Sequence, residues 1–292
     1  MVDEEIREHP EKEIYSAIEE IEKIILFNKN NSNSMRHYQH PYGSYKNEFF
    51  NEKITNYTCN DISVLLCIKD RPERFKIFYS FLESFLIKYN INLIIAEGKS
   101  DNIIDKQLFI KNNNVHHYLI DLGNKWSRSV LLNFAADKCN TEILILSDVD
   151  FIYSQAFWSN IEKMINKVNL NKVLIGLPLY ETHDTYSSNN KLVREKYESF
   201  SACYLIKKDI FLNVGGFNTR FTGYGWEERE LQKRLKLNNF FIFYSGLEYP
   251  DTYVLHYSHS NSFGRDSLTN KINLKLWKEQ KLKKIEFKTN LS

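Results

Sequence analysis

The sequence is poor in cysteine and contains no long apolar run. Its four cysteines stand far apart in 292 residues without a CxxC pair, which excludes a structural zinc site and a disulfide framework and predicts reduced thiols. No apolar stretch approaches the roughly 20 residues that a membrane-spanning helix needs. The N-terminus is acidic and polar, unlike a secretory leader. We therefore expect a cytoplasmic protein, either soluble or peripheral on the inner face of the membrane.

The chain also lacks an excess of charge of one sign. Thirty-nine basic and 37 acidic residues leave a net charge of +2, so there is no general basic field and we expect no nucleic-acid partner. Hydrophobic residues make up 42% of the chain and aromatic residues 14%. A chain of this length and composition buries a sizeable core, as one large domain or a domain with appendages.

Strand-type and helix-type patterns alternate from residue 62 onward. Strands are predicted at 62–68, 91–98, 115–122, 142–147 and 173–179, and helices at 75–89, 127–138 and 158–168. This alternation predicts a Rossmann-like α/β fold of three layers with a mostly parallel central sheet. In such sheets ligands bind outside the carboxyl ends of the strands. The polar segment 180–199 has no clear period and is interpreted as a loop, either a substrate cover or a disordered excursion.

Two appendages are predicted beside the main domain, which spans 60–265. Residues 1–50 combine a helical isoleucine pattern with an Asn-rich linker. Residues 266–292 contain 271-KINLKLWKEQKLKKIEF-287, in which six lysines surround a few apolar residues. This basic amphipathic helix either lies on an anionic membrane surface or packs on the domain as a solvated helix.

An acidic loop follows one of the most apolar strands. The run 143-ILILSDVDFIY-153 places Asp148 and Asp150 one residue apart directly after the strand. Carboxylates are hard oxygen ligands that suit Mg²⁺ or Mn²⁺ with bound phosphates. The loop is therefore either a metal-binding loop or a solvated strand end.

Three arginines stand where a nucleotide would bind. Arg71 and Arg74 follow the first strand, and Arg128 opens a helix. Guanidinium groups pair well with phosphate, so these side chains either contact the nucleotide or form surface charges and helix-face salt bridges.

A Gly- and aromatic-rich loop leads into an acidic cluster at 223-GYGWEERELQKRL-235. Glycines permit positive φ and close ligand approach, and a carboxylate beside them accepts a hydroxyl proton. The alternative is an ordinary helix start, because acidic side chains favour the first turn. Downstream, 253-YVLHYSHSNS-262 places His256 and His259 near the end of a strand, as metal ligands or as ordinary core and surface residues.

Three segments in this order resemble the inverting nucleotide-sugar glycosyltransferases of the GT-A fold. They are 67-CIKDRPERF-75, 126-WSRSVLLNFAADKCNTEILILSDVDFI-152 and 214-VGGFNTRFTGYGWEERELQKRL-235. The resemblance is greatest to the β-1,4-galactosyltransferase family and related bacterial capsule enzymes, and it covers about residues 60–265. The third segment matches that family's Gly-Gly-Phe turn followed by GWGGED. Here Trp226 stands where a glycine is usual, Glu228 replaces Asp, and Arg229 replaces a further acid.

The resemblance implies a role for each candidate residue. It implies that Asp150 and His256, or His259 in its place, hold Mn²⁺ or Mg²⁺, and that Asp148 contacts the ribose or a metal-bound water. It implies Glu228, or Glu227, as the base. It implies that Tyr224 and Trp226 form a wall for the sugars, and that Arg71, Arg74 and Arg128 bind the nucleotide. The implied reaction moves a hexose or N-acetylhexosamine from a UDP-sugar to a saccharide or lipid-linked saccharide acceptor, in surface polysaccharide or glycoconjugate synthesis.

Two other functions fit the same residues. A catalytically silent module of this fold would bind a nucleotide sugar or carbohydrate without transfer. A metal-dependent phosphohydrolase would need more clustered metal ligands than one DxD and one histidine, and it would release free sugar without an acceptor.

Overall fold

The computed structural model describes residues 9–30, 50, 56–123, 125–182, 193–195, 203–223, 225–257 and 268–280. Seven strands form the central sheet in the order β10-β6-β9-β4-β1-β2-β3. Their bounds are β1 Ile62–Ile68, β2 Asn92–Gly98, β3 Val115–Ile120, β4 Ile143–Ser147, β6 Val173–Gly176, β9 Tyr204–Lys207 and β10 Phe241–Tyr244. Of these seven, β9 alone runs antiparallel to its neighbours. The predicted, mostly parallel α/β sheet is confirmed.

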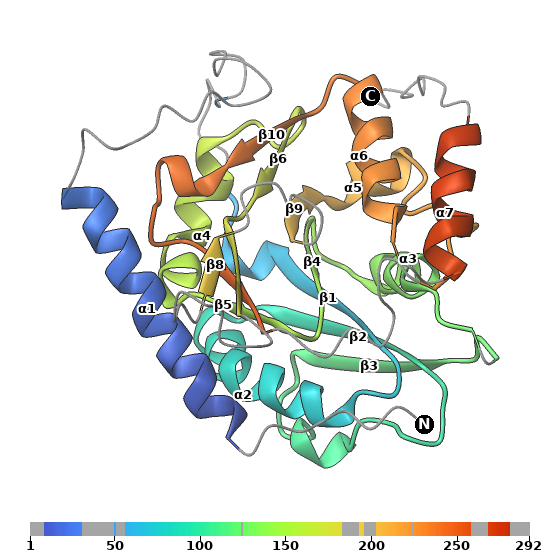
Figure 1. The fold of residues 1–292 in the computed structure, drawn as a ribbon, viewed down its shortest axis with the longest axis horizontal. Coiled ribbons are helices and arrows are strands. Elements are labelled where there is room, and N and C mark those ends of the chain that lie inside the picture. Colours follow the sequence, from blue (N-terminus) through green and yellow to red (C-terminus); the bar gives the residue numbers. More distant parts are fainter. Residues whose placement is uncertain are drawn as a thin grey trace.

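Helices cover both faces of this sheet, as the predicted three layers require (Figure 1). On one side lie α2 (Pro72–Tyr89) and α4 (Gln155–Lys167), and on the other lie α3 (Arg128–Lys138), α5 (Lys208–Asn213) and α6 (Glu227–Leu237). Successive side chains of β1 point to opposite faces, so Val64 and Leu66 join the first core while Leu65 and Cys67 join the second. Burial on both faces explains why the strand is apolar throughout.

A second sheet, in the order β5-β11-β7-β8, flanks the main one. Its strands are β5 Phe151–Tyr153, β7 Leu179–Thr182, β8 Val193–Glu195 and β11 Val254–His256. The predicted single strand 173–179 is in fact two strands, β6 and β7, in different sheets. Pro178 lies between them; it has no N–H to continue a ladder, so the chain changes sheets there. The predicted loop 180–199 accordingly begins inside β7.

The N-terminal helix α1 (Pro10–Asn30) packs on this second sheet (Figure 1). Its buried side chains Ile14, Ala17, Ile21 and Ile25 share a core with apolar residues of β5, β7 and β11. The Tyr257 hydroxyl donates to a Glu13 carboxylate oxygen over 3.2 Å. The helix thereby supports the sheet that carries part of the candidate site.

The C-terminal helix α7 (Leu268–Glu279) lies beside α6 (Figure 1). It packs on the domain through Asn273, which is 1% exposed, while Leu268 and Ile272 face outward. Residues 281–287 of the predicted basic helix lie outside the described residues, and the membrane contact stays a prediction. Among the helices that the structure describes, none is long and apolar enough to span a bilayer.

Candidate active site

The acidic loop lies at the carboxyl edge of the central sheet, where the fold gathers ligands. β4 ends at Ser147, and Asp148 and Asp150 follow it. β1 pairs in parallel with β4, so the loop after β1 ends at the same edge. From that loop, one terminal nitrogen of Arg71 lies 3.8 Å from Asp150 Oδ2. The structure thus brings two of the predicted site residues together.

Asp150 and His256 are brought together by the pairing of β5 with β11. His256 Nε2 lies 3.4 Å from Asp150 Oδ2, and both side chains are largely buried. Strand register causes this meeting: β11 runs antiparallel to β5 with His256 opposite Phe151, the residue after Asp150. The Tyr257 N–H also donates to the Asp150 carbonyl over 2.8 Å. Two residues about one hundred positions apart in sequence are therefore held as a pair by main-chain bonds.

Glu181 orients the histidine, and sequence reasoning missed it. Its Oε1 lies 3.1 Å from His256 Nδ1, because parallel pairing of β7 with β11 sets the two residues opposite each other. A carboxylate on one ring nitrogen fixes the imidazole so that the other nitrogen faces the ligand side. Burial opposes the charged ring, but the carboxylates of Asp150 and Glu181 outweigh it and raise the pKa of His256 to about 10. In the sequence, the only sign of this role was that Glu181 is a carboxylate, and it stood in the segment 180–199 that was interpreted as a loop.

The donor set of this pair fits a divalent cation. Two ligands each about 2.1 Å from one ion, at roughly a right angle, lie about 3 Å apart, close to the 3.4 Å between Asp150 Oδ2 and His256 Nε2. Within the described ranges, no group of three or more His, Cys, Asp or Glu side chains offers a complete cage. A cation here would take its other ligands from phosphate oxygens and water, as Mg²⁺ and Mn²⁺ commonly do.

Arg128 joins the acidic loop to the acidic helix. Its Nε donates to Asp148 Oδ1 over 2.8 Å, and a terminal nitrogen lies 3.2 Å from Glu228 Oε1. The guanidinium also lies over the Phe217 ring, 5.3 Å from its centre. The side chain is 7% exposed, and neither terminal nitrogen has hydrogen-bond geometry to any described group. Buried donors of this kind are normally satisfied, and one of the two lies within 3.2 Å of the Glu228 carboxylate. The other terminal nitrogen is a candidate donor to a polar ligand.

Of the two glutamates at the start of α6, Glu227 is buried and the Glu228 side chain is 16% exposed. Burial raises the pKa of Glu228 well above its usual range, while the Arg128 charge opposes that shift. Burial also raises the pKa of Glu227, and Arg128 again opposes it. Glu227 Oε2 is buried without a hydrogen bond to any described group. Carboxylates with raised pKa values, one of them incompletely bonded, are suited to accept a proton from a bound hydroxyl.

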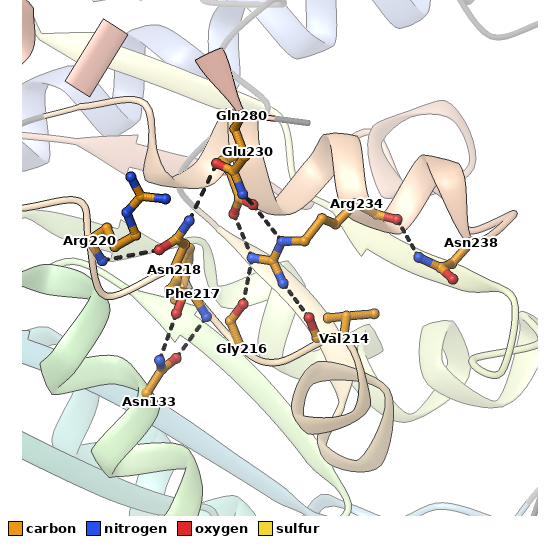
Figure 2. A network of polar contacts seen from close by, with 10 residues as sticks. All are labelled: Asn133, Val214, Gly216, Phe217, Asn218, Arg220, Glu230, Arg234, Asn238 and Gln280. Atoms are coloured by element: carbon orange, nitrogen blue, oxygen red, sulfur yellow. Dashed lines mark hydrogen bonds and ion pairs between the residues drawn. The ribbon is translucent and has the colours of Figure 1, made fainter. Parts of the chain in front are cut away.

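The Gly-Gly-Phe turn is hydrogen-bonded to α3, the helix that carries Arg128. Gly215 and Gly216 have φ values of +87° and +60°, and a Cβ at Gly216 would lie 2.5 Å from Asn133 Oδ1. Asn133 brackets Phe217 with two hydrogen bonds of 2.8 Å, one to its N–H and one to its C=O (Figure 2). The structure makes Asn133 the support of the ring beneath Arg128.

The remaining candidates differ in what the structure describes of them. Arg74 donates to the Tyr257 carbonyl over 3.2 Å and lies over the Tyr257 ring, so it holds the end of β11. Trp226 packs against α7, with its ring 5.1 Å from that of Trp277. Their roles toward nucleotide and sugar stay predictions. Tyr224 and His259 lie outside the described residues.

Comparisons with known proteins bear on the family and the fold. Residues 183–259 match the family described as the N-terminal domain of galactosyltransferase; this stretch contains Glu227, Glu228 and His256. No curated protein matches the sequence.

Solved structures share the fold at low sequence identity. GalNAc-T7, crystallised with UDP, GalNAc and Mn²⁺, is 11% identical with a TM-score of 0.52 over 81% of this chain and 49% of its own. The catalytic domain of Drosophila beta1,4galactosyltransferase 7 with xylobiose is 14% identical, with a TM-score of 0.39 over 63% of each chain. A mutant of that enzyme with manganese, UDP-Gal and xylobiose is 13% identical, with a TM-score of 0.41 over 63% of this chain and 64% of its own. The chain spans about half the length of GalNAc-T7 and under two thirds of the others.

The central sheet and its helices are those of the GT-A fold, and the predicted fold is confirmed. The resemblance to the galactosyltransferase family is confirmed over residues 183–259. The fold is therefore that of the GT-A glycosyltransferases, and residues 183–259 are similar to the galactosyltransferase family.

Proposed function

We propose that this chain is an inverting transferase that moves a hexose or N-acetylhexosamine from a UDP-sugar to a hydroxyl of a saccharide acceptor. The observation that carries the proposal is the double contact of Arg128, which joins Asp148 of the acidic loop to Glu228 of the acidic helix. This double contact supports assigning the pair Asp150 and His256 and the Glu228 carboxylate to one site. GalNAc-T7, which shares the fold, was crystallised with UDP, a sugar and Mn²⁺, which supports this choice of donor and cation.

The donor end of the site would hold the diphosphate. Asp150 and His256 would hold a divalent cation, which when bound neutralises the diphosphate and stabilises it as the leaving group. Glu181 keeps the His256 ring oriented. Arg71, 25% exposed and directed toward Asp150, is placed to contact a phosphate, and Asp148 is placed for a ribose hydroxyl or a metal-bound water.

The acceptor end would supply the base. Glu228 accepts the proton of the acceptor hydroxyl as that oxygen forms its bond to the anomeric carbon and the bond to the UDP oxygen breaks. Arg128 stabilises the ionised form of Glu228, because its charge opposes the effect of burial on the pKa of that carboxylate. The buried, unbonded Oε2 of Glu227 is suited to a second acceptor hydroxyl. Attack from the side opposite the diphosphate gives inversion.

The first test is a donor panel. The full chain is incubated with UDP-Gal, UDP-Glc, UDP-GalNAc and UDP-GlcNAc, with Mn²⁺ or with EDTA, and with and without saccharide acceptors. We expect one donor to support Mn²⁺-dependent transfer that EDTA abolishes. Donor binding without transfer to any acceptor would favour the silent binding module, and release of free sugar without an acceptor would favour the phosphohydrolase.

The second test addresses the base. Glu228→Gln keeps the size of the side chain but removes the proton acceptor, so transfer should fall about 10²–10⁴-fold while UDP affinity in Mn²⁺ stays nearly unchanged. Glu227→Gln is the matched neighbour and should cause a smaller loss. Isothermal titration with UDP and Mn²⁺ separates binding from turnover. Equal turnover in Glu228→Gln and the parent protein would reject this base.

A further inference from the structure

The inward face of α7 is mostly polar. The residues of this face are spaced by three, four and three positions, so they lie on one side of the helix and its C-terminal extension. They are Asn270, Asn273, Trp277 and Gln280, here called the amide stripe. Three of the four carry side-chain amides, which make directional bonds that a purely apolar face lacks.

The amide stripe is hydrogen-bonded to the loop that precedes the candidate base, Glu228. The Asn273 amide, 1% exposed, donates to the carbonyls of Thr222 and Gly225 over 2.9 and 3.0 Å. Trp226 Nε1 donates to Asn270 Oδ1 over 2.6 Å. The helix also approaches the loop closely at Gly223, where an added Cβ would lie 2.6 Å from the side chain of α7 residue Thr269.

Trp226 needs such support because of its backbone. It has φ +79° at the position that caps the start of α6, a left-handed conformation that is unfavourable for a bulky residue. Its ring lies 5.1 Å from Trp277, and its indole N–H is taken up by Asn270. The two residues that follow Trp226 are Glu227 and Glu228. The contacts that hold Trp226 against α7 therefore fix the start of the backbone that carries these two carboxylates.

The far end of the amide stripe joins a buried ion pair inside α6. Gln280 Nε2 donates to Glu230 Oε1 over 2.9 Å. Glu230 is fully buried and accepts two hydrogen bonds from Arg234, of 2.7 and 2.6 Å. The same guanidinium donates to the carbonyls of Val214 and Gly216 (Figure 2). One network therefore ties α7, α6 and the Gly-Gly-Phe turn together.

We propose that α7 is a positioning element of the active site, with Asn273 and Asn270 as positioning residues. Resting on the proposed function, the proposal is that they act through Thr222, Gly225 and Trp226 to hold the Glu228 carboxylate against Arg128 and toward the acceptor hydroxyl. Neither residue touches substrate. The groups proposed to hold the diphosphate, Asp150, His256 and Arg71, lie on strands and their loops outside this network, so loss of the amide stripe affects turnover and leaves donor binding in place.

The test is Asn273→Ala in the full chain. It removes two bonds to the loop, and we expect kcat to fall about 10- to 100-fold, the loss typical of a reacting group displaced by about 1 Å. The KM for the nucleotide sugar selected by the donor panel should be unchanged. Ile272→Ala, on the exposed side of the same helix, is the control and should match the parent protein. Asn270→Asp keeps the acceptor oxygen for Trp226 and should retain most activity, whereas Asn270→Leu should not.

Hydrogen exchange gives a readout that does not depend on activity. The Gly223 N–H donates to Trp126 O and the Glu230 N–H to Trp226 O, so these two amides report on the loop and on the start of α6. In Asn273→Ala we expect faster exchange at both, with the central strands unchanged. Unchanged exchange at these amides, a uniform increase over the whole chain, or an unchanged kcat would overturn the proposal. If the parent protein transfers no sugar, the proposed function fails, while exchange still decides whether α7 holds the loop.

Discussion

The two halves of the site are built by different means. In the metal half, Asp150, His256 and Glu181 are set by the register of β5, β11 and β7. In the base half, Glu227 and Glu228 start a helix whose approach is set by left-handed backbone and by side-chain bonds from other segments. Main-chain ladders place one half, and side chains place the other.

This difference teaches where each half is vulnerable. A strand register tolerates most side-chain changes because main-chain bonds define it, so the metal half depends on the identity of its own ligands and of Glu181. The base half depends on residues that never reach the reacting atoms, such as Asn133, Asn273 and Gly216. Arg128 contacts the carboxylate of Asp148, in the acidic loop of the metal half, and that of Glu228, in the base half.

In this comparison of the two halves, the largest effect is expected in the metal half, at Glu181, which contacts the ring nitrogen of His256 that faces away from Asp150. Glu181→Gln removes the charge that orients His256, and Mn²⁺ affinity should fall about 10- to 100-fold. Electron paramagnetic resonance titration of Mn²⁺ in the presence of UDP measures it. Glu279→Gln, an exposed carboxylate on α7, is the control. An affinity equal to that of the parent protein would remove Glu181 from the metal half.

A smaller effect is expected where the two halves are joined. Burial raises the pKa of Glu228 and the Arg128 charge opposes it, so Arg128→Met should raise that pKa further. A base must be ionised to act, so the acid limb of the kcat/KM profile should move to higher pH, with about a tenfold loss for each pH unit below the limb. Lys138→Met, exposed near the end of the same helix, should leave the limb in place. If the acid limb of the kcat/KM profile lies at the same pH in Arg128→Met, the ionisation of Glu228 does not determine that limb.

The smallest effect is expected at the Gly-Gly-Phe turn, where a substitution should change the free energy of unfolding but not the chemistry of the site. Gly216→Ala puts a Cβ 2.5 Å from Asn133 Oδ1 at a φ of +60°, whereas Gly123→Ala has a similar φ of +58° with nothing within 4 Å. The first should lower the free energy of unfolding by about 1–3 kcal/mol, and the second by less. Urea unfolding measures both, and Mn²⁺ affinity should be unchanged in each folded variant. Equal losses would mean that the contact with Asn133 adds nothing to the cost of the left-handed backbone.

Much of the fold could be predicted from local pattern. β1 coincides with its predicted run 62–68, and α3 begins beside Ser127 and ends at Lys138 as expected. Buried apolar runs and helical periods are local properties, so they are visible in the sequence. The strand at 253–255 was predicted and corresponds to β11, but the antiparallel β9 and the strands β5 and β8 were not, because three- and four-residue strands carry too little periodicity.

The sequence by itself determined the layered α/β fold, because strand and helix signals are local. Its resemblance to a known family named Asp150, His256 or His259, and Glu228 or Glu227 as candidates. Only the tertiary structure decided that Glu181 stands behind His256, that Arg128 joins Asp148 to Glu228, and that α7 grips the loop before the base. Those contacts join residues from about 20 to 100 positions apart. Sheet register and helix packing, which depend on the whole chain, bring them within bonding distance.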